Sequence, residues 1–197
     1  MKIFVNTKFT SLRKENSLIS IGLVDENGNY FYGEVIGYSK QYLDDWTQTN
    51  IVDKLLYKGN KFFIEEDVDD ISYVAISDTK KNVRKKLNAW LDKYDKVEWV
   101  LDVGHYSFVN LLDLITPYAI NIPSKYDRTY TELNELIAKD KDLSLNDAFD
   151  VEIYDYIQDF NKGAVFPNYN SNALMNAHVI RVVYYKLAEN KDVEVKL

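Results

Sequence analysis

The length, composition and charge of this chain exclude several classes of protein. Its 197 residues include 46% hydrophobic residues and three prolines, enough to bury the core of one ordered domain, which we expect to span 1–197. Because there is no cysteine, disulfides, thiolate chemistry and cysteine-based zinc sites are excluded. The net charge of −7 argues against a protein that coats nucleic acid, but not against one that grips a single strand in a local groove.

Hydrophobic runs in the chain are short. None approaches 18 residues, so we expect no transmembrane helix and no membrane partner. The N-terminal MKIFVNTK has too short an apolar core for a signal peptide. With the absence of cysteine, these features favour a cytoplasmic location.

The first third of the chain predicts a three-stranded meander. Residues 2–6 form a short apolar run, and apolar residues alternate through Ser17–Val35 on both sides of the turn Glu26–Asn29, which is typical of strands. Between Gln41 and Tyr57 the spacing predicts one broken helix or two short ones, and a further strand is expected near Ser72–Ser77.

The rest of the chain alternates between helices and one strand. A helix capped by Asp78 or Thr79 has apolar residues at helical spacing, namely Val83, Leu87, Trp90 and Leu91. KVEWVLDV then predicts a strand and YSFVNLLDLI a helix. A loop-rich section follows, with helices near Tyr130–Lys139 and Leu145–Phe160, and a last helix has one apolar stripe made of Ala173, Ala177, Ile180, Tyr184 and Leu187. This order predicts an α/β fold with an RNase H-like mixed sheet, an antiparallel three-stranded meander plus parallel strands, flanked by helices.

Three motifs carry a resemblance to a known family. NTKFTSL and SLISIGLVDENG lie near the start, EWVLDVGHYSFVNLLDLI in the middle and SNALMNAHVIRVVYYKL near the end. In these motifs the chain resembles the DEDD-type 3′–5′ exonucleases of the RNase H-like superfamily, closest to the small exoribonuclease-like group of bacteria and phages. In that family four carboxylates hold two divalent ions, which generate the attacking hydroxide, and a histidine acts as general base.

The resemblance places no carboxylate at the family's catalytic positions. In chain order the family's Asp, Glu, Asp, His and Asp correspond here to Asn6, Lys8, Ser107, Ser171 and Asn176. Magnesium prefers anionic oxygen ligands, and the Lys8 ammonium would repel it. We therefore expect no intact catalytic set, no bound metal and no cofactor, with the lysine substituting electrostatically for a lost ion.

Asp102 and three nearby candidates for binding have alternative interpretations. Asp102 could supply one metal ligand, but one carboxylate does not hold two ions, and a polar residue at a strand end is the simpler reading. Lys8, His105 and Tyr106 are candidate binding residues. His178 lies beside the stripe of the last helix, where a neutral histidine, packed or at the surface, is expected rather than a general base.

The charged runs and the aromatic residues give further predictions. The basic run Lys80–Lys86 predicts a solvated helix face, with a phosphate-contacting strip as the alternative, and the acidic run Glu65–Asp70 lacks the spacing and glycine of a calcium loop. The tryptophans are expected in the core, at Trp46, Trp90 and Trp99. Exposed tyrosines could stack bases or form a protein interface, at Tyr126, Tyr130, Tyr154, Tyr156 and Tyr169.

These observations leave three hypotheses of function. The first is a catalytically inactive exonuclease-like protein, a pseudonuclease that acts by binding a protein partner or single-stranded nucleic acid, as a monomer or homodimer. The second is an active 3′–5′ exoribonuclease that uses Mg²⁺ or Mn²⁺ in a rearranged site, built from Asp102, Asp113 and a loop acid near Asn6. The third is a structural, oligomer-forming protein.

Overall fold

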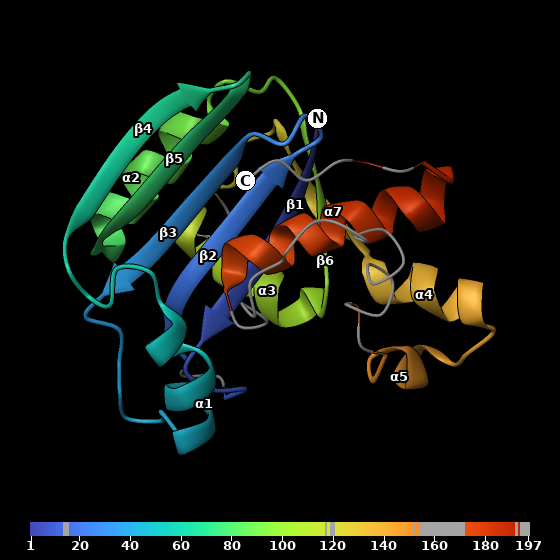
Figure 1. The fold of residues 1–197 in the computed structure, drawn as a ribbon, viewed down its shortest axis with the longest axis horizontal. Coiled ribbons are helices and arrows are strands. Elements are labelled where there is room, and N and C mark those ends of the chain that lie inside the picture. Colours follow the sequence, from blue (N-terminus) through green and yellow to red (C-terminus); the bar gives the residue numbers. More distant parts are fainter. Residues whose placement is uncertain are drawn as a thin grey trace.

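A seven-stranded mixed sheet with helices on both faces forms the centre of the molecule (Figure 1). The computed structural model describes residues 1–13, 16–116, 118, 121–151, 153, 172–191 and 193. The strand order is β4-β5-β3-β2-β1-β6-β7. None of the described helices combines the length and the hydrophobicity needed to cross a membrane.

Antiparallel and parallel pairs are combined in the sheet. β1, β2 and β3 form the antiparallel meander, β6 and β7 extend it in parallel beyond β1, and β5 pairs in parallel with β3 while β4 pairs antiparallel with β5. The predicted α/β fold, with a mixed sheet made of an antiparallel three-stranded meander plus parallel strands and flanked by helices, is confirmed. The strands are β1 (Lys2–Phe9), β2 (Leu18–Asp25), β3 (Tyr30–Ile36), β4 (Phe62–Val68), β5 (Ile71–Thr79), β6 (Val97–Leu101) and β7 (Tyr126–Glu132).

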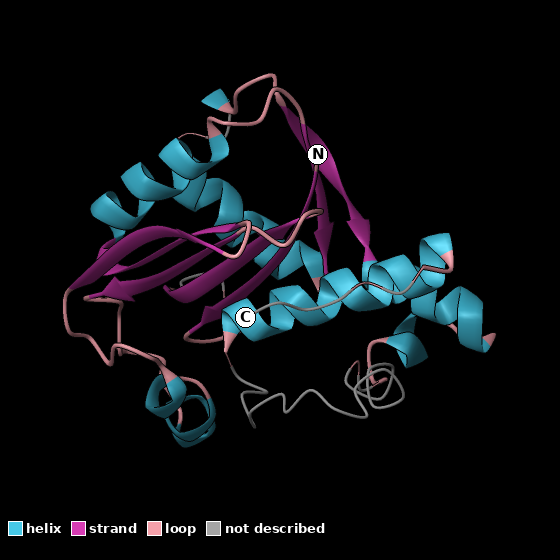
Figure 2. Cartoon of the chain, turned by 45° about the horizontal axis from the view of Figure 1, so that its top comes forward, coloured by secondary structure: helices cyan, strands magenta, loops and turns pink. Residues whose placement is uncertain are grey.

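Helices cover both faces of the sheet. α2 and α3 pack on one face and α7 crosses the other, with α4 beside α7 (Figure 2). The described helices are α1 (Asp45–Asn50), the 3₁₀ turn η1 (Val52–Lys54), α2 (Lys80–Leu91), α3 (Gly104–Ile115), α4 (Leu133–Lys141), α5 (Leu145–Ala148) and α7 (Ala173–Glu189).

The structure corrects the limits of three predicted elements and adds two strands that were not predicted. The first strand continues from residue 6 to Phe9, so it carries Lys8 within the sheet. The acidic β4 and the polar β7 were not predicted as strands, because edge strands lack a clear apolar alternation. The helix expected from Tyr130 begins at Leu133, and α5 ends at Ala148, with most of 149–160 outside the described residues.

Alternate residues of β1 divide the core into two layers. Ile3 and Val5 pack toward α2 and α3, whereas Phe4 packs against α7, as the period of two in a strand requires. Trp90 and Trp99 are buried as expected, and the stripe of α2 predicted from its spacing is buried at Val83, Leu87, Trp90 and Leu91.

The predicted burial of two aromatic residues was wrong. Trp46 was expected in the core but is 65% exposed, since the short α1 buries Thr47 and leaves the indole outside. Tyr126 was expected at the surface but is buried against Trp99, with ring centroids 5.6 Å apart. Tyr130 is half-buried, and the other three tyrosines of that set lie outside the described residues.

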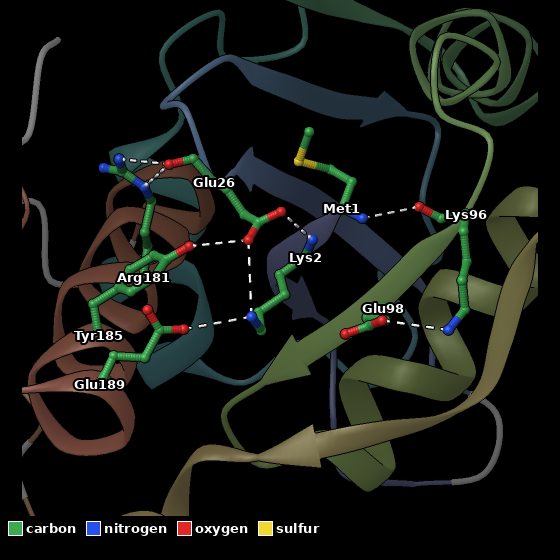
Figure 3. A network of polar contacts seen from close by, with 8 residues as sticks. All are labelled: Met1, Lys2, Glu26, Lys96, Glu98, Arg181, Tyr185 and Glu189. Carbon is green, nitrogen blue, oxygen red and sulfur yellow. Dashed lines mark hydrogen bonds and ion pairs between the residues drawn. The ribbon is translucent and has the colours of Figure 1, made fainter.

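A polar network at the start of β1 holds the C-terminal half of α7 (Figure 3). The Glu26 carboxylate accepts hydrogen bonds from the Lys2 backbone N–H at 2.9 Å and the Tyr185 hydroxyl at 3.3 Å. Arg181 donates to the Glu26 carbonyl oxygen at 2.9 Å, and the Lys2 ammonium lies 3.4 Å from Glu189. The network connects α7 to the β2–β3 turn and to β1.

The N-terminal end of α7 lies directly on β2. Asn172 caps this helix, because its Oδ1 accepts the Leu174 N–H at 2.9 Å. A Cβ added at Gly22 would meet the Ala173 carbonyl oxygen and lie 2.5 Å from the Leu174 Cα. Only glycine permits this backbone approach.

We expect Gly22→Ala to destabilise the protein by about 3 kcal/mol or more, because a backbone contact cannot shift as a side chain can. Chemical denaturation measures the change. Gly37→Ala is the matched control, since nothing lies within 4 Å of an added Cβ there; its positive φ of 83° should cost about 1 kcal/mol. Equal losses for the two variants would contradict the contact between α7 and β2.

Candidate functional site

A cavity of about 430 Å³ lies at the carboxyl ends of β1 and β6. Because β1 and β6 pair in parallel, with Val5 opposite Leu101, the residues that follow this pair lie at one edge of the sheet. The cavity walls come from β1 and the loop after it, from α1 and its cap, from the β6–α3 junction and from α7.

The cavity brings together most of the sequence-predicted site residues. Asn6, Lys8, Ser107 and Asn176 all line it, and Asp102 lines it as well. Ser171 lies outside the described residues.

Other candidates lie elsewhere. His105 is exposed at the start of α3, and neither it nor Tyr106 is among the lining residues. Tyr106 stacks on the lining residue Phe9 with ring centroids 5.8 Å apart, and so supports the wall from behind. Asp113 forms an ion pair with Lys80 on the outer surface. Of Asp102 and Asp113, only Asp102 therefore reaches the cavity.

Lys8 brings a positive charge into the cavity. Its backbone pairs with Ser20 of β2, and its side chain lies among the lining residues. Burial lowers the pKa of Lys8 to about 8, and the nearby Asp102 carboxylate opposes part of this change. At neutral pH the ammonium is mostly charged, although its charge is only partly solvated.

Asp102 is oriented by the junction between β7 and α4. The Asn134 side-chain amide donates to Asp102 Oδ1 at 2.9 Å and to Glu132 Oε1 at 3.0 Å. Glu132 in turn accepts the Gly104 N–H at 2.7 Å. The carboxylate nearest to Lys8 thus belongs to a hydrogen-bonded network that also fixes the start of α3.

Val103 turns the chain from β6 into α3. Its φ of 51° lies in the left-handed region, which is costly for a β-branched residue. This turn lets α3 begin at Gly104 and directs Ser107 toward β1, where its Oγ accepts a hydrogen bond from the Thr7 hydroxyl at 3.2 Å. Local strain of this kind is often retained at functional sites.

Sequence reasoning missed the wall formed by α1. Asp44, Trp46, Thr47 and Ile51 line the cavity, and the Asp44 carboxylate caps α1 by accepting the Thr47 N–H at 2.7 Å. Two short helices between Gln41 and Tyr57 were one of the predicted alternatives and are present as α1 and η1, but no motif placed α1 beside the site. One available signal was Asp44, since aspartate is a preferred residue at a helix N-cap.

The described donors do not fit a two-metal centre. Asp44 and Asp102 are the carboxylates that line the cavity, and Asp44 is already engaged as a cap. In the described part of the chain, no group of three or more histidine, cysteine or acidic side chains could hold a metal ion. A lysine beside the remaining carboxylate adds repulsion for a cation.

His178 is packed and neutral, one of the two roles expected for it. It is 1% exposed in α7, and neither ring nitrogen has a hydrogen-bond partner within the described residues. Burial and the neighbouring Arg181 lower its pKa to about 3. Its ring meets Tyr30 edge-on at 5.8 Å, and it does not line the cavity.

A solved structure described as a full-length 3′-exonuclease has the same fold. The two superpose with a TM-score of 0.62 at 10% sequence identity, over 100% of this chain and 91% of the other. No family model and no curated protein matches the sequence. The chain therefore has an exonuclease-like fold.

We expect NMR titration of the Lys8 side chain to give a pKa near 8 rather than 10.5. Since the unfolded chain binds more protons between these two values, stability should rise with pH through this window. Lys8→Met should remove that rise and stabilise the protein below pH 8 by about 1–2 kcal/mol, measured by urea denaturation. The exposed Lys81→Met is the control; a Lys8 pKa near 10.5 would contradict the burial of the ammonium.

Proposed function

We propose that the chain is a catalytically inactive exonuclease-like protein of the DEDD type, and that its cavity holds an end of single-stranded nucleic acid without cleaving it. The observation that carries this proposal is the position of Lys8, which lies in the cavity with Asn6, Ser107 and Asn176 around it. These are the positions at which the resemblance to the family expects metal ligands.

Charge is the first reason to propose an anionic ligand. In a two-metal nuclease the ions neutralise the phosphate. Here the Lys8 ammonium offers a positive charge in the same cavity, and the Asp102 carboxylate offsets only part of the cost of burying that charge. A phosphate beside Lys8 would restore the solvation that the cavity removes.

The aromatic wall is the second reason. Trp46 is 65% exposed and lines the cavity together with Phe9. Exposed rings beside a cation suit single-stranded nucleic acid, because bases stack on aromatic faces while lysine contacts the backbone. The Asn6 Oδ1 atom is buried and has no hydrogen-bond partner in the described residues, so this cavity residue carries an acceptor that the described protein atoms do not satisfy.

The second candidate function is an active exoribonuclease with Mg²⁺ or Mn²⁺. One observation favours it: Asp44 is a loop acid that lines the cavity together with Asp102. Against it, Asp113 lies on the outer surface with Lys80, and Asp44 is held by the cap of α1. The third hypothesis, a structural oligomer, has no specific observation in its favour.

Binding and cleavage of the same oligonucleotides separate the two candidates. We expect labelled single-stranded RNA or DNA with a free 3′ end to bind in EDTA and to stay intact with Mg²⁺ or Mn²⁺. Trp46→Ala should weaken binding by about 1–3 kcal/mol, the range for one stacked base. Lys8→Met should weaken binding and reduce the salt slope by about 0.7, the value for one phosphate of a single strand.

Lys81→Met serves as the control for charge, because Lys81 is exposed on α2, away from the cavity. Shortening from the 3′ end that needs metal and disappears in Asp102→Ala would overturn the proposal in favour of the active enzyme. Absence of both binding and cleavage would show that the cavity does not take nucleic acid.

Restoring the family's side chains tests the correspondence of positions. The five substitutions are Asn6→Asp, Lys8→Glu, Ser107→Asp, Ser171→His and Asn176→Asp. Because four new carboxylates and Asp102 would then share one cavity, we expect the variant to bind Mn²⁺, as measured by calorimetry. A folded variant that binds no Mn²⁺ would contradict the correspondence.

A further inference from the structure

The outer edge of β4 is an open strand edge. β4 is the last strand in the sheet order and pairs only with β5 among the described strands. Figure 1 shows it at the rim of the sheet, with α2 behind it and no described element beyond it. Six of its seven residues are exposed, and only Ile64 is half-buried. A row of backbone N–H and C=O groups is therefore available to another strand.

This edge is regular and held from both faces. All seven residues pair with β5 without a register shift. The Phe62 ring stacks on Tyr57 with centroids 4.1 Å apart, and the Lys86 ammonium lies 3.7 Å from the Phe63 ring centroid on the other face. β4 contains no proline or bulge, the usual devices that stop edge strands from pairing.

The carboxylates of β4 hinder unwanted pairing at its edge, and their charge determines which partner strand can bind. Glu65, Glu66 and Asp67 follow one another in the strand. Glu65 lies 3.7 Å from Lys86, and Glu66 accepts the Tyr73 hydroxyl at 2.8 Å, so both carboxylates are held beside the edge. Pairing with a second β4 would bring two acidic runs together, and like charges on adjacent strands repel. A basic strand would be attracted.

Apolar surface on both faces of β4 adds to this choice. Phe62 is 38% exposed, Phe63 is 47% exposed and Val68 is 49% exposed. Because successive residues of a strand face opposite sides, a partner strand would cover apolar area on each side of the sheet. The surface therefore suits a segment in which basic and apolar residues are mixed.

We propose that the β4 edge, Phe62–Val68, binds an extended peptide segment rich in lysine or arginine as an eighth strand of the sheet. Main-chain hydrogen bonds supply the pairing, and the carboxylates of β4 supply the preference for basic side chains. The proposal is independent of the cavity and of its ligand.

The test uses three capped peptides of the same length as β4. One alternates lysine and valine, the second is the same peptide methylated on alternate backbone nitrogens, and the third alternates glutamate and valine. We expect the first alone to bind by fluorescence anisotropy, with amide NMR shifts confined to β4 and β5. Equal binding of the methylated peptide, shifts elsewhere, or no binding of the first peptide would overturn the proposal.

Charge reversal provides the second arm. Glu65→Lys with Glu66→Lys should weaken binding of the basic peptide by about tenfold or more, since the attraction becomes repulsion. Glu135→Lys with Asp140→Lys makes the same change in net charge on α4 and should leave binding within about twofold. The affinities of the two variants are compared only if both variants unfold at the same denaturant concentration, so that a difference in binding does not reflect a difference in stability. A wild-type dimer whose β4 amides shift on dilution would assign the edge to a second copy instead, against the proposal.

Discussion

The parallel pairing of β1 with β6 is the constraint on which the rest of the site depends. Val5 lies opposite Leu101 at the last pair, so Asn6 and Asp102 leave the ladder side by side at one edge of the sheet. The N-terminal end of α7 then lies over β2 because Gly22 admits its backbone, which places Asn176 above the same edge. Three segments that are distant in the sequence thus meet in one cavity.

Lys8 determines the electrostatics of that cavity. Its ammonium is desolvated, with Asp102 as the carboxylate that favours the charged form. Asp102 is itself bound by Asn134, which also binds Glu132, so the negative charge cannot move away from the lysine. A pair of divalent cations and a fixed lysine repel each other, whereas an anionic group complements the lysine. A cavity with Lys8 in place of divalent cations therefore complements an anion through the lysine charge.

Elements with a buried face could be predicted from the sequence, and those without one could not. α2 shows an apolar period of about four because one of its faces packs in the core, and β2, buried along its whole length, keeps an apolar alternation with a period of two. β4 and β7 lie at the two edges of the sheet, where polar residues hide the strand period. Trp46 was misplaced because a tryptophan in a short apolar pattern usually packs inward, whereas the capped α1 directs this one outward.

The gathering of Asn6, Lys8, Ser107 and Asn176 was within reach of the sequence, since motif order fixes which strand ends meet. The α1 wall was not, because α1 belongs to no motif. Its place depends on Glu34, which is 1% exposed in β3 and accepts the Leu56 N–H at 2.7 Å and the Tyr57 N–H at 3.1 Å. A buried carboxylate that binds a distant loop leaves no periodic trace in the sequence.

Glu34 also decides how the cavity and the β4 edge influence each other. Tyr57 stacks on Phe62 of β4, and the segment before Tyr57 leads back to Ile51 in the cavity wall. A strand docked on Phe62 would press on Tyr57, but the Tyr57 and Leu56 amides are held by Glu34. Energetic coupling between two sites needs an element that can adopt two arrangements. Because Glu34 binds the Leu56 and Tyr57 amides, the segment that connects the two sites has a single arrangement. The fold therefore favours two surfaces that bind independently of each other.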